Sequence, residues 1–129
     1  MRTTALLLFT AILAFGCSGP VARPFPYGTP SGAVCPDGSL LTYETFGRSF
    51  MEHYCTRCHS TTNVGDARNG APPDLNWNVL ATIRENADRM DAIAASGPLQ
   101  HNNVMPPTAP FPIGSERTNL GIWLACGAP

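Results

Sequence analysis

The segment Cys55-Thr56-Arg57-Cys58-His59 limits what this chain can fold into more than any other feature. Two cysteines three positions apart lie on one turn of a helix, so both thiols can bond to a single planar group. The adjacent histidine then lies beside that group, where its neutral imidazole can bind a metal ion. Cys-x-x-Cys-His is the signature of covalent c-type haem attachment. We therefore predict one haem c, bound through thioether bonds to Cys55 and Cys58, with His59 as an axial ligand of its iron.

Other chemistry is open to a Cys-x-x-Cys pair, namely a redox-active or structural disulfide or half of a zinc site. Zinc would need further Cys or His ligands at close spacing. The remaining histidines, His53 and His101, have no such partner cysteine nearby. The histidine directly after the second cysteine favours haem over these alternatives.

The N-terminus has the pattern of an export signal. An apolar run at residues 5–15 is too short to cross a bilayer and fits the central region of a signal peptide. The small residues before Cys17 resemble a bacterial lipobox, so we predict a signal peptide at residues 1–16 and a lipid on Cys17. The alternative is ordinary cleavage near Gly16 or Ala22, which would release a soluble periplasmic protein.

The chain contains five cysteines. With a lipid on Cys17 and haem on Cys55 and Cys58, Cys35 and Cys126 are left as an even remainder. Export implies the periplasm or the cell envelope, and in such an oxidising compartment two remaining cysteines are expected to pair. We therefore predict a disulfide between Cys35 and Cys126, in a protein attached to the membrane through its lipid.

Charge says little about partners. Eight basic side chains against nine acidic ones give a formal net charge of −1, and only 13% of the residues are charged. No basic stripe is present that could follow a nucleic acid, so we expect no nucleic-acid partner. Docking with another protein would depend on apolar contact more than on electrostatic steering. We expect a monomer.

Three segments divide the chain after the signal peptide. Residues 17–41 are rich in proline and glycine, which favours an extended, lipid-attached linker over a packed element. From Thr42 apolar residues recur at three- and four-residue spacing and predict a helix that leads into Cys55. Residues 42–129 are therefore predicted to form one small domain, in which a buried haem would supply much of the apolar contact that so short a chain lacks.

Two further helices are predicted in this domain. One begins near Asn76 and is interrupted near Ala87, and the last begins after Ser115 as its N-cap. Four prolines between Leu99 and Gly114 exclude a regular helix there. No segment shows convincing strand alternation, so the fold is predicted to be all-α, with three to four helices.

The attachment segment, followed far downstream by Met105 in the proline-rich string Val104-Met105-Pro106-Pro107, resembles the small class I cytochromes c. The resemblance covers about residues 43–127. It implies a cytochrome c-like fold around one haem, with the thioether of Met105 as the second axial ligand. It also implies that the first and last helices cross near Trp123.

The same resemblance assigns a role to the Pro73-Asp74-Leu75 segment. In that family a proline carbonyl accepts a hydrogen bond from the second ring nitrogen of the ligand histidine, which fixes its tautomer. The resemblance implies that Pro73 supplies this carbonyl to His59, with Pro72 as the alternative.

The function implied is electron transfer between redox protein partners, without enzyme activity, because two axial ligands leave no open position on the iron. The alternative is a haem protein that binds small ligands or acts as a peroxidase, with an open distal position or with His101 as the distal ligand. A third possibility is an accessory haem lipoprotein that serves one fixed membrane complex.

Overall fold

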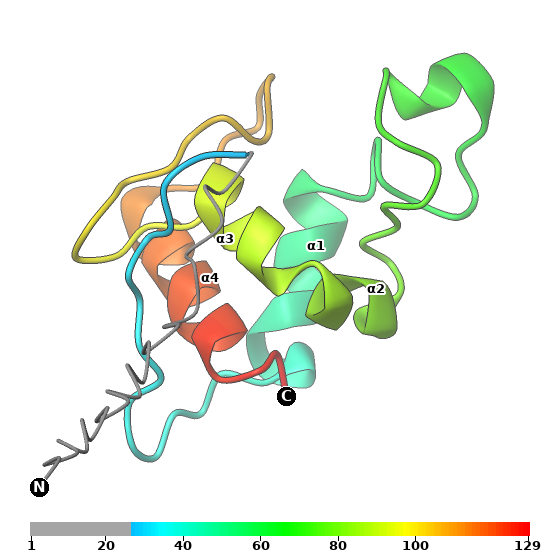
Figure 1. Cartoon of the computed structure of the whole chain (residues 1–129). Coiled ribbons are helices and arrows are strands. Elements are labelled where there is room, and N and C mark those ends of the chain that lie inside the picture. Colours follow the sequence, from blue (N-terminus) through cyan, green and yellow to red (C-terminus); the bar gives the residue numbers. More distant parts are fainter. Residues whose placement is uncertain (1–26) are drawn as a thin grey trace, which may run out of the picture.

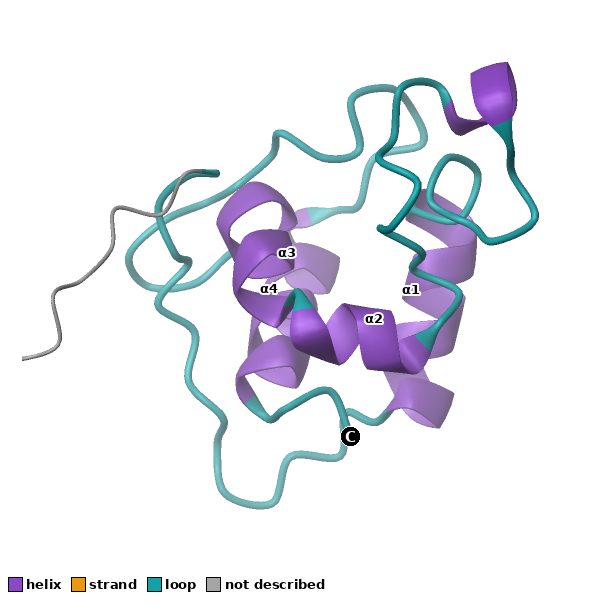
Figure 2. Cartoon of the chain, turned by 45° about the vertical axis from the view of Figure 1, so that its right-hand side comes forward, coloured by secondary structure: helices purple, strands orange, loops and turns teal. Residues whose placement is uncertain are grey.

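The structure is a computed structural model, and it describes residues 27–129. The predicted signal peptide and Cys17 lie outside the described residues. Four α-helices, one π-helical turn and one 3-10 turn follow along the chain: η1 (Tyr43–Gly47), α1 (Arg48–Tyr54), η2 (Gly65–Arg68), α2 (Leu80–Glu85), α3 (Ala87–Ala94) and α4 (Gly114–Ala125). Long loops connect them and no strand occurs in this part of the chain, in agreement with the all-α prediction (Figure 2).

The first predicted helix begins where the sequence indicates but starts with a wider turn. Thr42 precedes η1, where its hydroxyl accepts a hydrogen bond from the Thr45 backbone (3.1 Å) and the Thr45 hydroxyl accepts one from the Thr42 backbone (2.9 Å). This reciprocal cap satisfies amides that the first turn leaves free. The helix then continues as α1, which buries Phe50, Met51 and Tyr54 and ends directly before Cys55.

The predicted second helix is divided as expected, between α2 and α3 at Asn86, whose side-chain amide donates to the Thr82 carbonyl (2.9 Å). It begins later than predicted, at Leu80 instead of near Asn76. The reason is that the Trp77 backbone donates to the carbonyl of His59 (2.9 Å), which holds this stretch against the attachment segment before the helix can start.

The last helix begins at Gly114, so Ser115 lies in its first turn and is not the N-cap that the sequence predicts. The capping contact comes from Glu116, whose carboxylate accepts a hydrogen bond from the backbone of Ile113 (2.9 Å). The same carboxylate oxygen accepts one from the Tyr54 hydroxyl (2.8 Å), which joins the start of α4 to the end of α1.

The prediction that residues 17–41 form an extended linker is wrong for residues 29–35, which pack against the helices (Figure 1). Ser31 is fully buried, and its backbone amide and hydroxyl both donate to the carboxylate of Asp91 on α3 (2.7 and 2.5 Å). The Asn102 side chain donates to the Thr29 carbonyl (2.9 Å). These hydrogen bonds, made by the buried side chains of Ser31 and Asn102, hold a proline-rich segment that lacks any regular structure of its own.

The Cys35–Cys126 disulfide is present, as predicted, and it links residues 91 positions apart. It fastens the N-terminal segment to the end of α4. Close approach between the two depends on Gly121, where an added Cβ would lie 2.8 Å from the Ser96 carbonyl oxygen and 2.9 Å from the Cβ of Ala33. A cross-link that closes so long a loop restricts the unfolded chain strongly.

Trp123 of α4 lies at the centre of the core and is fully buried. Its ring stacks on Tyr43 with centroids 6.4 Å apart and meets the edge of Phe46 at 6.1 Å. Gly47 lets the first helical segment approach this ring, because a Cβ there would lie 2.4 Å from the indole carbon Cζ2. The first and last helical segments therefore meet at Trp123. No helix in the described part of the chain is long and apolar enough to cross a membrane.

Gly47→Ala should destabilise the protein by about 1–3 kcal/mol, because the added methyl overlaps a buried ring that has no room to move. Gly114→Ala is the matched control, since nothing lies within 4 Å of a Cβ at that position. Urea unfolding followed by tryptophan fluorescence measures both. Equal midpoints for the two variants would contradict the close packing at Trp123.

Loss of the disulfide in a Cys35→Ser, Cys126→Ser double variant should lower the free energy of unfolding by about 2–4 kcal/mol. The physical reason is the freedom regained by the unfolded chain between the two positions. Thermal unfolding of the variant and of the wild type gives the difference, and mass spectrometry without reductant checks the pairing. Two free thiols in the wild type would contradict it.

Candidate functional site

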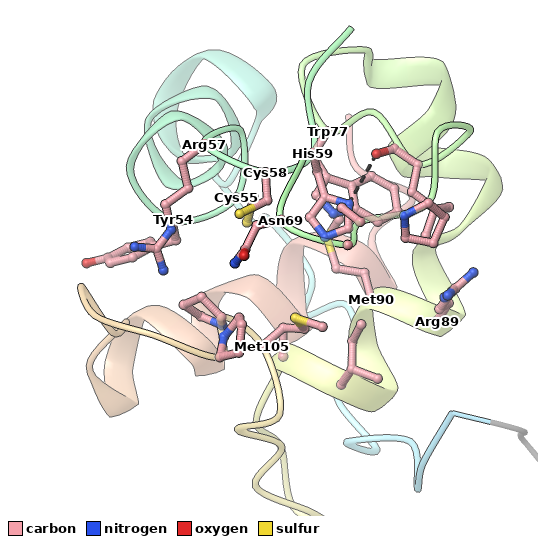
Figure 3. Close-up of a pocket in the computed structure, with 18 of the residues that line it drawn as sticks. Tyr54, Cys55, Arg57, Cys58, His59, Asn69, Trp77, Arg89, Met90 and Met105 are labelled. Atoms are coloured by element: carbon pink, nitrogen blue, oxygen red, sulfur yellow. Dashed lines mark hydrogen bonds between the residues drawn. The ribbon is translucent and has the colours of Figure 1, made fainter. Parts of the chain in front are cut away.

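One cavity brings together the residues that the sequence singles out, although they come from distant parts of the chain (Figure 3). Its walls come from the attachment segment, from α1, α3 and α4, and from two loops. In the view of Figure 3, Cys55, Cys58 and His59 lie on the upper wall and Met105 on the lower one. The lining is mainly apolar and includes Phe50, Leu75, Trp77, Met90, Ile93, Ala94, Pro106, Pro107 and Leu120.

The attachment segment continues the helical path of α1 for one more turn. The Cys55 backbone donates to the Met51 carbonyl (2.9 Å), and the His59 backbone donates to the Cys55 carbonyl (3.0 Å). Cys55 and Cys58 therefore lie on one turn, partly buried, and neither is in a disulfide. Burial raises the pKa of the Cys55 thiol to about 12, against the opposing effect of nearby Arg57 and Arg117. In the protein alone this side chain is a neutral thiol.

His59 is held as a neutral imidazole. Its Nδ1 lies 3.1 Å from the Leu75 carbonyl oxygen, an arrangement in which Nδ1 carries the proton and the lone pair is on Nε2. Burial is the main reason that the pKa of His59 is lowered, with Arg68 and Arg89 acting in the same direction and the Leu75 hydrogen bond against it. Trp77 packs on the ring with centroids 5.3 Å apart. These contacts fix a ring whose Nε2 is available as a metal ligand.

Pro73, the predicted partner of His59, does not make this hydrogen bond. Its carbonyl accepts from the side-chain amide of Asn76 (3.0 Å), while the alternative, Pro72, accepts from Arg68. The Leu75 backbone amide also donates to the Pro72 carbonyl (3.2 Å). Both proline carbonyls therefore already have hydrogen-bond partners. The carbonyl of Leu75 takes the role instead. The hydrogen bond to His59 therefore comes from the predicted segment, but from Leu75 and not from Pro73.

Met105 lines the cavity at the end opposite the attachment segment, and its backbone is fixed on both sides. Its amide donates to the Ile93 carbonyl of α3 (2.9 Å), and its carbonyl accepts from the Arg117 guanidinium (2.9 Å). Further along the same loop, the carbonyls of Thr108 and Ala109 accept hydrogen bonds from Arg57 of the attachment segment. The loop that carries Met105 is thus tied to three other parts of the molecule.

Arg117 is a site residue that the sequence analysis did not identify. It is 3% exposed, and its Nη1 lies within hydrogen-bond distance of three carbonyl oxygens, those of Ala94 (2.7 Å), Asn102 (3.0 Å) and Met105. Burial lowers its pKa. The sequence did contain a sign of this role. Arg117 lies three residues before Leu120, on the face of α4 that is buried, and it is the charged residue on that face.

The lining of the cavity also shows which other side chains could compete with Met105 as the second ligand. Met90 of α3 is buried and lines the cavity as well, so the cavity contains a second methionine. His101 is exposed, does not line the cavity, and has its Nδ1 against the Ser96 hydroxyl (2.5 Å). His53 is exposed and does not line the cavity either. His101 is therefore a poor candidate for the distal ligand.

Two unbonded thiols on one turn, an imidazole of fixed tautomer and a thioether share one apolar cavity, and this donor set fits a covalently attached haem. Within residues 27–129 no three His, Cys, Asp or Glu side chains gather so that they could hold a metal ion. The disulfide that forms uses Cys35 and Cys126 instead of the attachment cysteines.

Comparison with models of known protein families, with curated proteins and with solved structures finds no match to this chain. Its function is therefore inferred from the residues of the cavity and from their geometry.

Arg117→Leu should destabilise the protein by about 1–3 kcal/mol, because it removes the donor to two buried carbonyls and one partly buried carbonyl and leaves them without this partner. Arg48→Leu is the control. Arg48 is exposed and contacts Glu44 and the face of the Tyr43 ring (5.4 Å to its centroid), so its loss should lower the free energy of unfolding by about 1 kcal/mol or less. Urea unfolding of both variants measures the two changes in the free energy of unfolding. Equal changes would show that the buried hydrogen bonds of Arg117 add no more stability than the surface contacts of Arg48.

Proposed function

We propose that this protein carries single electrons on one covalently attached haem c, with His59 and Met105 as its axial ligands. The observation that supports this most is the meeting of Cys55, Cys58, His59 and Met105 in one cavity. Nothing in the local sequence requires Met105 to lie opposite the attachment segment. In this proposal the four helices form a cytochrome c-like fold around the haem.

Each of the four residues has a definite part in this proposal. Cys55 and Cys58 would hold the haem through thioether bonds, so it cannot dissociate during function. His59 would bind the iron through Nε2, because the Leu75 carbonyl keeps the proton on Nδ1. Once bound, the haem would supply reversible one-electron exchange between its ferric and ferrous forms.

Met105 would close the second axial position. A thioether is a soft ligand that favours ferrous iron and so raises the reduction potential. Its loop is held by Ile93, Arg117 and Arg57, which favours a ligand that stays in place when the charge on the iron changes. With both positions taken, no open site is left for a substrate, and we propose a carrier and not an enzyme.

The proposed partners are an electron donor and an electron acceptor, both proteins, that dock briefly through a small interface. Several exposed apolar side chains lie near the candidate ligands in the chain, among them Val104 beside Met105 and Phe111 farther along its loop. They suit docking by apolar contact, in keeping with the low content of charged residues. We propose that the carrier itself is monomeric.

The proposed location is the periplasm or the cell envelope, with a lipid on Cys17 as the membrane attachment. The predicted signal peptide supports export. The Cys35–Cys126 disulfide supports it independently, since structural disulfides persist in oxidising compartments.

The proposal is tested by the visible spectrum of the protein produced together with haem-maturation machinery. We expect haem that stays bound after denaturation, a c-type reduced spectrum, and the weak far-red ferric band that reports a thioether ligand. Cys55→Ser, Cys58→Ser should abolish covalent haem. Met105→Ala should remove the ferric band and allow carbon monoxide to bind the ferrous protein.

Met90→Ala and His101→Ala are the matched controls, because they remove the second methionine of the cavity and the rival histidine. Both should keep the ferric band. Loss of the band in Met90→Ala alone would reassign the ligand to α3. Carbon monoxide binding by the wild type would point to the alternative function, a protein that binds small ligands, and the absence of covalent haem would overturn the proposal.

A further inference from the structure

The Leu75 carbonyl that orients His59 has a second hydrogen-bond donor. The Arg68 Nη2 lies 3.0 Å from the same oxygen that His59 Nδ1 approaches at 3.1 Å. Arg68 is the last residue of η2 and is only 7% exposed. A charged side chain, with no direct contact to the cavity, is thus one carbonyl oxygen away from the candidate iron ligand.

Arg68 is fixed by several contacts at once. Its Nη1 donates to the Ser60 carbonyl (2.7 Å) and to the side-chain oxygen of Asn76 (3.1 Å), and its Nε donates to the Ala71 carbonyl (3.0 Å). Pro72 also accepts from Nη2. These acceptors all belong to the loop that follows His59, at residues 60–76. The guanidinium therefore holds the Leu75 carbonyl in place by gathering the backbone around it.

The charge of Arg68 is balanced by dipoles alone. Among residues 27–129 the one ion pair lies elsewhere, between Arg48 and Glu44. A buried cation that faces only carbonyl and amide oxygens keeps its full electrostatic effect on nearby groups, because little water screens it. His59 is coupled to this cation through the shared Leu75 oxygen.

A carbonyl oxygen has two lone pairs and can accept from both donors, but each hydrogen bond weakens the other. The positive guanidinium also repels the positive end of the His59 N–H bond. Both effects limit how far the N–H proton shifts toward the carbonyl, and so limit the negative charge that gathers on the ring. A less negative ring donates less charge to a bound metal and favours the lower oxidation state.

We propose that Arg68 is a positioning residue that fixes the Leu75 carbonyl for His59 and, by sharing that carbonyl, raises the reduction potential of the site. This inference rests on the proposed function, since it concerns a His59 that binds haem iron. It adds a residue outside the cavity to those that set the potential.

The test compares Arg68→Gln and Arg68→Lys with Arg84→Gln in the haem-loaded protein. Arg84 is the matched control, because it also donates to a backbone carbonyl, that of Ala128 (3.0 Å), but this is not the carbonyl that His59 approaches. Arg68→Gln removes the charge, and Arg68→Lys keeps it without the forked geometry. Each variant is examined by redox titration and by the exchange rate of the His59 ring N–H proton in the ferrous state.

Arg68→Gln should lower the ferrous-to-ferric ratio at a fixed ambient potential by up to about tenfold, which for one electron is about 59 mV. Arg68→Lys should fall between this variant and the wild type, and Arg84→Gln should match the wild type. The His59 proton should exchange faster in both Arg68 variants. A purely structural role would lower stability and leave the potential and the exchange rate unchanged, which would overturn the proposal.

The outcomes also separate this proposal from the function on which it rests. If the wild type shows covalent haem and thioether ligation but Arg68→Gln keeps its potential, the role of Arg68 is wrong and the electron carrier stands. If the wild type lacks covalent haem, the function itself is wrong. If neither Arg68 variant folds, hydrogen exchange of the arginine guanidinium protons is measured in the wild type with labelled arginine. Exchange at Arg68 as fast as at the exposed Arg48 would exclude the hydrogen bonds of Arg68 and overturn the proposal.

Discussion

Two buried arginines that donate to backbone carbonyls hold this small domain around its cavity. Arg68 gathers the carbonyls of the loop beside His59, and Arg117 gathers those on the side of Met105. A chain with short helices and long proline-rich loops leaves many carbonyls that no helix can satisfy, and burying them alone is costly. Within residues 27–129 every buried side-chain nitrogen and oxygen has a hydrogen-bond partner. The two arginines thus supply hydrogen-bond partners for carbonyls in the irregular loops beside the cavity.

The helices and the disulfide close the rest of the molecule around this arrangement. Trp123 joins the first and last helical segments, and Gly47 permits their contact. The Cys35–Cys126 bridge and the Ser31–Asp91 contact add the N-terminal segment to the same body. Because this segment lies on α3 and α4, it braces the two helices that form the far wall of the cavity.

In the proposed carrier, one candidate ligand is held through its side chain and the other through its backbone. His59 is fixed by the Leu75 carbonyl, and that carbonyl is fixed in turn by Arg68. Met105 is fixed through its own amide and carbonyl. A site whose ligands are held before a cofactor binds needs little rearrangement when its charge changes, and this is the physical requirement for fast exchange of electrons.

The sequence by itself determined the local features. It was sufficient for the helical turn that carries Cys55 and Cys58, the helix that leads into it, the break near Ala87 and the pairing of Cys35 with Cys126, because each depends on spacing or on cysteine count. Only the tertiary structure decided which carbonyl meets His59, that residues 29–35 pack, and that Arg117 supports Met105. Those contacts join residues far apart in the chain or depend on the path of an irregular loop, and neither is encoded in a local period.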